Sequence, residues 1–355
     1  MSLFNEMLGA GESLFKQEDA LDPEYLPKLL PYRELQQKQI ASAIKPLFSD
    51  RNGRNLFVFG SPGIGKTAAA RWVLRDLEET TDEVLQLFIN CWQKNSTYKI
   101  MLEICSLLDY KFTQNKNTDE LFNVIKNMVN KKSAVFVFDE IDKVEDLDFL
   151  YAILNDIEKK TVVLITNYKN WIASLEDRIK SRLLPETLEF KSYTKEETKE
   201  ILKQRIGFAF VPGVWAQDAF ELVASRAGEI HDVRAGLFLL RQAGLAAEEA
   251  GQKRIALSHA QKSIEKLSTY ETEKTPDLES DEKLVLELVK SNSGKKIGEL
   301  FELYTKQGGT GTYKTFQRRI EKLEKGGMIT SSRTFGGKEG NTTVITYQQP
   351  KLTEF

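Results

Sequence analysis

The stretch GSPGIGKT at Gly60–Thr67 is the most informative part of this 355-residue chain. It fits the pattern G-x-x-x-x-G-K-[ST] in full, between the apolar run Leu56–Phe59 and the helix-like segment Ala68–Glu79. Glycines at these positions let backbone amides point at phosphate oxygens, and the start of a helix adds the positive end of its dipole. The pattern therefore predicts a strand, a phosphate-binding loop and a helix in succession.

The residues of this loop also predict the cofactors. We expect Lys66 to neutralise the β- and γ-phosphates of a bound nucleotide, and the Thr67 hydroxyl to hold Mg²⁺. The residues expected to contact the nucleotide here are Gly60, Ser61, Pro62, Gly63, Ile64, Gly65, Lys66, Thr67 and Ala68. ATP or ADP with Mg²⁺ is the predicted cofactor set.

A second motif, AVFVFDEID at Ala134–Asp142, places two acids where an apolar strand should end. Apolar burial cannot explain Asp139 and Glu140. Asp139 fits the second Mg²⁺ partner, and Glu140 fits the base that polarises the attacking water. Asn167 follows the apolar run Val162–Thr166 and fits a side chain that holds this water, although a lone asparagine at a strand end is also typical of a turn. ATP hydrolysis is the expected reaction.

Apolar runs alternate with helix-length segments between Leu56 and Phe190, which predicts an α/β domain with a mostly parallel sheet. The expected strands are Leu56–Phe59, Val84–Ile89, Ala134–Phe138 and Thr161–Ile165. Beyond Thr194 the strand pattern ends, and amphipathic stretches predict a small helical domain. Its expected helices include Glu196–Arg205, Ala216–Ala227 and Val233–Ala250.

The remainder of the chain predicts a linker and a third domain. Thr269–Ser280 is polar and contains Pro276, as is typical of a linker. Helices are expected after it at Asp281–Lys290, Lys295–Lys306 and Tyr313–Lys325, and a hairpin at Ile329–Phe335 and Thr342–Tyr347 around GGKEGN. This order is that of a winged helix. The predicted domains are an ATPase core at 1–192, a helical lid at 193–268, the linker at 269–280 and the winged helix at 281–355.

Composition excludes several other classes of protein. Hydrophobic residues make up 41% and charged residues 29% of the chain, with a mean hydropathy of −0.38, as is typical of a soluble globular protein. No apolar stretch approaches the roughly 20 residues of a membrane helix, and the start lacks a secretory pattern, so a cytoplasmic location without membrane contact is expected. The 2 histidines stand far in sequence from the 2 cysteines, which argues against a zinc site.

Positive charge gathers in the last domain. The whole chain has a net charge of −2, but from Asp281 onward 13 Lys or Arg stand against 9 Asp or Glu. In the expected third helix of this domain, Phe316, Ile320 and Leu323 form an apolar face opposite a basic row, which fits a recognition helix on double-stranded DNA. A solvated surface fits too, since Glu321 stands beside the basic row. The predicted DNA contacts are Thr312, Lys314, Thr315, Gln317, Arg318 and Lys322, with Arg333 and Lys338 on or near the hairpin.

With these motifs in place, the chain resembles the AAA+ ATPases, and among them the archaeal replication initiators of the origin-recognition and cell-division-control type. The resemblance also rests on Ala20–Gln36, which looks like the family's N-terminal box, on Phe88–Leu108, and on FLYAIL at Phe149–Leu154, which resembles the initiator-specific helix region. Asn167 falls at the sensor 1 position. The resemblance implies that adenine lies near the N-terminal box, with Pro31, Tyr32 and Arg33 as the candidate contacts.

The resemblance also implies roles for three arginines. Leu175–Phe190 looks like the box that supplies an arginine finger to a neighbouring subunit's nucleotide, and it holds Arg178 and Arg182. Arg182 is favoured because clamp-loader relatives place the finger in a Ser-Arg pair. HDVRAG resembles sensor 2, with His231 and Val233 in place of the usual glycine and alanine, and Arg234 at the position that reaches the γ-phosphate. Each of these arginines also fits a plain surface charge.

The function implied is that of an ATP-dependent replication initiator. Such a protein binds origin DNA, helps to recruit the replicative helicase, self-associates on DNA, and hydrolyses ATP slowly as a conformational switch. The residues themselves leave two other functions open. One is a DNA motor of the branch-migration helicase or clamp-loader kind, and the other is a regulator that binds nucleotide without hydrolysing it.

Overall fold

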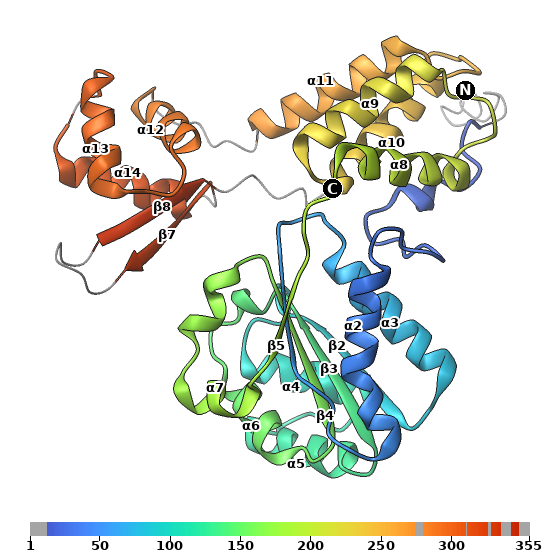
Figure 1. The fold of residues 1–355 in the computed structure, drawn as a ribbon, viewed down its shortest axis with the longest axis vertical. Helices are drawn as coiled ribbons and strands as arrows, with labels where there is room; N and C mark the ends of the chain where they lie inside the picture. The colour runs from blue at the N-terminus through green and yellow to red at the C-terminus, as the bar shows by residue number, and fades with distance from the viewer. Residues whose placement is uncertain (1–12, 274–279, 310, 326–327, 335–341, 348–355) are drawn as a thin grey trace. The chain divides into compact units, whose positions relative to one another are not determined.

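The computed structural model describes residues 13–273, 280–309, 311–325, 328–334 and 342–347 (Figure 1). The chain divides into two compact units, Met1–Gln261 and Lys262–Phe355. The first unit contains the phosphate-binding loop, and the second contains the predicted recognition helix. In the described part of the chain, no helix is both long and apolar enough to cross a bilayer.

The first unit is built on a parallel five-stranded sheet with the order β2-β3-β4-β1-β5. Its strands are β1 (Leu56–Phe59), β2 (Val84–Asn90), β3 (Ser133–Asp139), β4 (Lys160–Thr166) and β5 (Glu186–Glu189). The four strands expected from the sequence are confirmed to within one residue at each end. The sequence did not predict β5, because this edge strand buries only Leu188 and has no apolar run.

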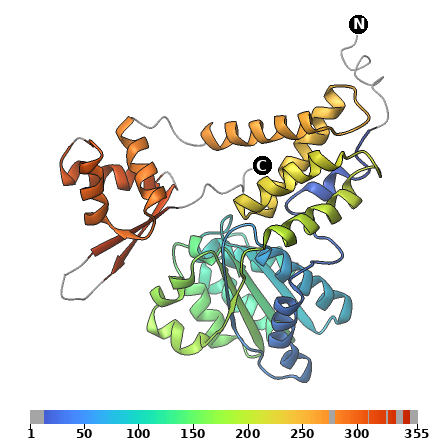
Figure 2. The same ribbon diagram turned by 45° about the horizontal axis from the view of Figure 1, so that its top comes forward.

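Helices cover both faces of the sheet, so β3 is buried along its whole length. Side chains that alternate along β3 point to opposite faces: Phe136 and Phe138 to one, Val135 and Val137 to the other. The phenylalanine face packs against α4 (Thr97–Leu107), α5 (Thr118–Val129), α6 (Asp148–Asp156) and α7 (Asp177–Leu183). The valine face packs against α2 (Glu34–Ile44) and α3 (Lys66–Thr80), which lie together on that side in Figures 1 and 2.

A group of helices follows the sheet: α8 (Lys195–Ala209), α9 (Gln217–Ile230), α10 (Val233–Glu249) and α11 (Leu257–Glu273). The start of the described chain packs on these helices, because the rings of Phe15 and Phe210 lie 4.8 Å apart and Arg205 Nη1 donates to Ala20 O at 2.9 Å. Helix α11 crosses the division between the units and continues five residues into the predicted linker. The domain boundaries named above stay predictions.

The second unit contains α12 (Ser280–Ser291), β6 (Lys295–Lys296), α13 (Ile297–Lys306), α14 (Tyr313–Lys325), β7 (Ile329–Thr334) and β8 (Thr342–Tyr347). The strands form an antiparallel sheet of order β6-β8-β7. Three helices followed by a hairpin is the predicted order, typical of a winged helix. The expected second helix starts two residues late, because Lys295 and Lys296 pair with β8.

The apolar face predicted for α14 forms the core of this unit. Phe316 and Leu323 are fully buried, and Ile320 is nearly so. The Phe316 ring lies 5.1 Å from the Tyr304 ring and 5.5 Å from the Phe301 ring, measured between centroids. These aromatic contacts hold α14 against α13, so the exposed face of α14 is presented in a defined orientation.

Replacement of Phe316 by alanine should destabilise the second unit alone. Loss of a fully buried phenylalanine costs about 3–5 kcal/mol. All four tryptophans, Trp72, Trp92, Trp171 and Trp215, lie in the first unit. In urea, Phe316→Ala should therefore shift part of the far-UV circular dichroism transition and leave the tryptophan fluorescence transition in place. Phe112→Ala, which removes a ring that is 78% exposed, is the control and should change neither. A fluorescence transition that moves with Phe316→Ala would contradict this expectation.

Candidate nucleotide-binding site

The phosphate-binding loop connects β1 to α3, as the motif predicts. Gly63 and Gly65 have φ angles of +71° and +88°, a region in which side chains other than glycine are strained. Lys66 is the first residue of α3, so the amides of the loop lie at the amino end of this helix. This is the arrangement in which a helix dipole and backbone N–H groups bind an anion.

Lys66 lies at the centre of the site. Its Nζ donates to Gly60 O at 2.9 Å, to Ser61 O at 2.7 Å and to Asn167 Oδ1 at 2.8 Å. Asn167 follows β4, which is hydrogen-bonded to β1 in the sheet. The structure therefore brings together two residues that the sequence predicted for one site, although 101 positions separate them.

The acids at the end of β3, Asp139 and Glu140, lie beside the same loop. Thr67 Oγ1 donates to Asp139 Oδ2 at 2.8 Å, and the Glu140 amide donates to Asp139 Oδ1 at 3.1 Å. Burial raises the pKa of Asp139 to about 6, against the opposing effects of the Thr67 hydrogen bond and the Lys66 charge. Glu140 has a left-handed backbone, with φ +54°, so the chain turns sharply where the strand ends.

Arg33 has a structural role that the sequence did not reveal. The side chain is buried, and its Nε donates to Ile64 O in the phosphate-binding loop at 3.0 Å. Its Nη2 donates to Lys191 O at 2.7 Å, and the guanidinium lies 3.8 Å from the centre of the Tyr193 ring. Arg33 thus ties the N-terminal box to the loop and to the segment before α8. Its predicted contact with adenine stays a prediction.

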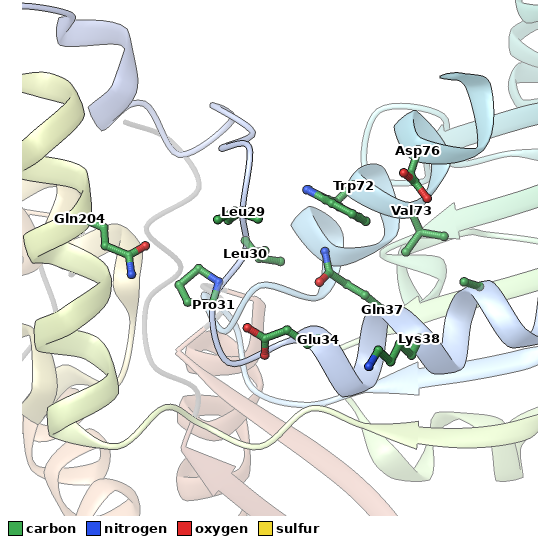
Figure 3. A pocket seen from close by; sticks show the side chains of 11 residues that line it. Leu29, Leu30, Pro31, Glu34, Gln37, Lys38, Trp72, Val73, Asp76 and Gln204 are labelled. Atoms are coloured by element: carbon green, nitrogen blue, oxygen red, sulfur yellow. The ribbon is translucent and has the colours of Figure 1, made fainter. Parts of the chain in front are cut away.

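A cavity of about 550 Å³ lies beside the N-terminal box, between α2 and α3 (Figure 3). Pro31 lines this cavity, whereas Tyr32, with φ +64°, is 40% exposed and is not among its walls. Apolar walls predominate, and Gln204 of α8 lies across from α3. Gln37 lines the cavity, and its buried Nε2 has no hydrogen-bond partner among the described residues.

The lid touches the phosphate-binding loop through the turn between α9 and α10. His231 has φ +58°, so the position where the resembled motif carries glycine does adopt a left-handed conformation. The Val233 amide donates to Gly63 O at 3.4 Å. The Arg234 guanidinium pairs with Asp232, with Nη2 and Oδ2 2.8 Å apart. Arg234 thus directly follows two residues, Asp232 and Val233, that contact Gly63 of the loop. Its sensing of the γ-phosphate stays a prediction.

The two candidate finger arginines differ in their partners. Arg178 bonds two carboxylates, Glu176 at 2.5 Å and Asp148 at 2.9 Å, and these hydrogen bonds raise the pKa of its guanidinium. Arg182 Nε donates to the neutral Asn155 Oδ1 at 3.2 Å. Both guanidinium groups lie over the Tyr151 ring. Release of Arg182 toward a phosphate would break fewer charged contacts than release of Arg178.

Comparison with known proteins places the chain in a family. Residues 49–168 match the model of an AAA domain, and residues 199–265 match that of the Cdc6 AAA+ ATPase-type lid domain. The ORC1-type DNA replication protein 1 of Sulfurisphaera tokodaii is 31% identical over 94% of this chain and 89% of its own length. The chain belongs to the ORC1-type DNA replication proteins.

Solved structures agree with this membership. The Aeropyrum pernix ORC1 protein, solved in complex with DNA, is 27% identical to this ORC1-type chain, covers 96% of it with 96% of its own chain, and has a TM-score of 0.69. A Thermotoga maritima RuvB structure is 18% identical, with a TM-score of 0.50 over 92% of this chain and 96% of its own, and this likeness shows a shared fold alone. The predicted AAA+ core with a lid is thereby confirmed.

The second unit of this ORC1-type protein presents only part of the predicted DNA contacts. Lys314 and Arg318 are exposed on α14. Lys322 is also exposed, but its Nζ pairs with the buried Glu282 of α12 at 2.7 Å. The Thr312 and Thr315 hydroxyls bond each other at the start of α14, Gln317 is half-buried, and Arg333 is described only as backbone in β7. Lys338 lies outside the described residues.

Arg319, which was not among the predicted site residues, lies on the less exposed side of the same helix. Its Nη2 lies 2.5 Å from Asp281 Oδ2, and its Nη1 donates to Tyr304 Oη at 2.5 Å. Together with Lys322 and Glu282 this makes two ion pairs between α12 and α14. Arg319 thus stabilises the contact between α12 and α14. From the sequence alone it looks the same as a DNA-binding residue, because only the folded structure brings α12 next to it.

Replacement of Asp139 by asparagine should stabilise the protein without nucleotide or metal at neutral pH. The folded-state pKa of about 6 lies above the unfolded value of 3.8, so protonation of this carboxyl favours the fold. That contribution is complete below about pH 4 and is lost as the pH rises through about 6. In EDTA, Asp139→Asn should exceed the wild type in unfolding free energy by about 2–3 kcal/mol at pH 7.5 and by much less at pH 4.

Urea denaturation at the two pH values checks this, with Asp109→Asn, at an exposed position with φ +56°, as the control that should show no such pH dependence. An equal stability difference at both pH values would contradict the burial argument for Asp139.

Proposed function

We propose that this ORC1-type protein is a replication initiator that binds origin DNA, with ATP and ADP as the two states of a conformational switch. The observation that carries the proposal is the 31% identity to a DNA replication protein over 94% of the chain, which spans both the nucleotide site and the winged-helix unit. AAA+ membership supports nucleotide binding and ATPase activity. Binding of the Aeropyrum pernix ORC1 protein to DNA supports the same partner here.

The residues after β1, β3 and β4 suit ATP hydrolysis. Lys66 would exchange its three oxygen contacts for phosphate oxygens, and the loop amides would hold the β-phosphate. Glu140, which directly follows Asp139, would polarise the attacking water, and Asn167 would orient it once Lys66 has turned to the nucleotide. These assignments of catalytic and nucleotide contacts are proposals.

Mg²⁺ fits the oxygens of Thr67 and Asp139, which lie 2.8 Å apart. Mg²⁺ in nucleotide sites takes one or two protein oxygens together with phosphates and water, and a hydroxyl and a carboxylate are ligands of that kind. When bound, the ion would neutralise charge that develops on the phosphates. Its positive charge would also favour the ionised form of Asp139 against the effect of burial.

Slow turnover follows from the proposed place of the arginine finger. An arginine that stabilises the transition state raises the rate of hydrolysis by a factor of about 10³–10⁵. Arg182 of a second copy is our candidate, because its present partners are neutral oxygens. A single molecule would then hydrolyse ATP slowly, and self-association on DNA would speed the reaction. Recruitment of the replicative helicase by the ATP-bound form completes the proposed role.

The motor of the branch-migration or clamp-loader kind is not favoured. The RuvB likeness is weaker in both identity and TM-score than the likeness to the ORC1 protein. The regulator that binds nucleotide without hydrolysing it is not favoured either, because AAA+ membership supports ATPase activity and the candidate catalytic residues Glu140 and Asn167 are both present.

Replacement of Glu140 by glutamine should preserve ATP binding and abolish most hydrolysis. The amide keeps the size of the side chain but cannot accept a proton from water, and loss of a general base costs about 10²–10⁴ in rate. Phosphate release and binding of a fluorescent ATP analogue measure the two effects separately. Glu145→Gln, at an exposed position, is the control that should retain both. Wild-type turnover in Glu140→Gln would mean that another residue is the base.

Joint replacement of Lys314 and Arg318 by alanine should weaken binding to duplex DNA. Each phosphate contact that is lost should lower the slope of log affinity against log salt by about 1. Gel shifts at several salt concentrations, with ATP and with ADP, measure this effect. Lys283→Ala with Lys306→Ala removes the same charge from exposed positions on α12 and α13 and should have a smaller effect. Equal losses in the two double variants would show that charge alone, and not α14, binds the duplex.

A further inference from the structure

The turn between α9 and α10 places a carboxylate directly on the phosphate-binding loop. A Cβ atom added to Gly63 would lie 1.9 Å from Asp232 Oδ1 and 2.5 Å from Asp232 Oδ2. The backbones meet at the same place, where the Val233 amide donates to Gly63 O. Asp232 therefore packs against the bare Cα of a loop residue, with no other side chain between them.

This carboxylate holds Arg234 in three ways. Asp232 Oδ1 accepts the Arg234 backbone amide at 2.9 Å, which caps the start of α10. The same oxygen accepts from Arg234 Nε at 3.1 Å, and Oδ2 accepts from Nη2 at 2.8 Å. The pair is largely shielded from water, since the two side chains are 20% and 12% exposed. A bidentate pair in this setting is a strong and well-oriented contact.

A nucleotide phosphate at the loop would compete for the same guanidinium. Arginine binds carboxylates and phosphates with the same planar pair of N–H donors, so Arg234 cannot satisfy both in this way at once. Its transfer to a phosphate would leave Asp232 unpaired, shielded and close to a second anion, which is unfavourable on both counts. The transfer should therefore depend on how much negative charge the nucleotide brings to the loop.

We infer that Asp232 is a positioning residue that competes with the γ-phosphate for Arg234, and so sets how strongly the lid distinguishes ATP from ADP. The inference rests on the proposed function, because it assigns a regulatory step to the same nucleotide site. With ADP, Arg234 stays on Asp232, and the turn stays on Gly63. With ATP, the third phosphate takes Arg234, and Asp232 loses the cation that offsets its charge beside the loop. The partner of Arg234 in the lid then follows the number of phosphates.

The test compares ATP and ADP affinities of Asp232→Asn with those of the wild type, measured by calorimetry on the full chain. Asparagine keeps the size and the helix cap but removes the charge. Without that competition Arg234 should bind the third phosphate more readily, so the ratio of ATP to ADP affinity should rise about tenfold, which is about 1.4 kcal/mol. Asp232→Ser also places an uncharged helix-capping residue at this position and should raise the ratio as well. Agreement between the two variants would show that the lost charge, and not the asparagine side chain itself, causes the change.

A double-mutant cycle separates positioning from packing. If Asp232 acts through Arg234, then Asp232→Asn in an Arg234→Gln background should change the affinity ratio by less than about twofold. Asp218→Asn removes an exposed carboxylate at the start of α9 and should leave the ratio unchanged.

An unchanged ratio in both Asp232 variants, or an equal rise without Arg234, would overturn the inference while wild-type nucleotide binding still supports the proposed function. A wild-type protein that binds neither nucleotide would instead refute the proposed function itself.

Discussion

The Lys66 ammonium, held among three oxygens at one edge of the sheet, is the interaction on which the rest of the site depends. It joins the phosphate-binding loop to the end of β4 through Asn167, while Thr67 joins α3 to the end of β3 through Asp139. In a parallel sheet these strand ends must lie at the same edge, and the order β3-β4-β1 places them next to one another. The chemistry therefore requires this strand order as much as it requires the individual side chains.

The loop is also the place where three separate parts of the chain meet. Arg33 brings the N-terminal box to it, Asp232 brings the lid to it, and the Arg33 contact with Lys191 O brings the segment that leads into α8. The Arg33 contact with Ile64 O uses a backbone atom of the loop, and Asp232 fills the space left by the missing side chain of Gly63. A ligand that shifts this backbone can thus act on the core and on the lid at once, which is the mechanical requirement of a nucleotide switch.

In the second unit, the basic residues of α14 differ in their partners. Arg319 and Lys322 form ion pairs with acids of α12, and Lys322 stays exposed, as Lys314 and Arg318 are. The two pairs join α12 to α14, and the buried Phe316 packs against Phe301 and Tyr304 of α13. The count of basic residues in this unit therefore overstates the charge that is available to DNA.

Local patterns were sufficient to predict four of the five core strands, the phosphate-binding loop, the acids after β3 and the apolar face of α14, because each depends on residues that are neighbours in sequence. Asn167 was predictable only from its order among the strands. Four other features could not be predicted in this way: the strand β5, the contacts of Arg33 with the loop, the pairing of Lys322 with Glu282, and the packing of Asp232 on Gly63. Each of them joins segments that are distant in sequence, and whether a charged side chain is buried or exposed is decided by the partner that folding brings to it.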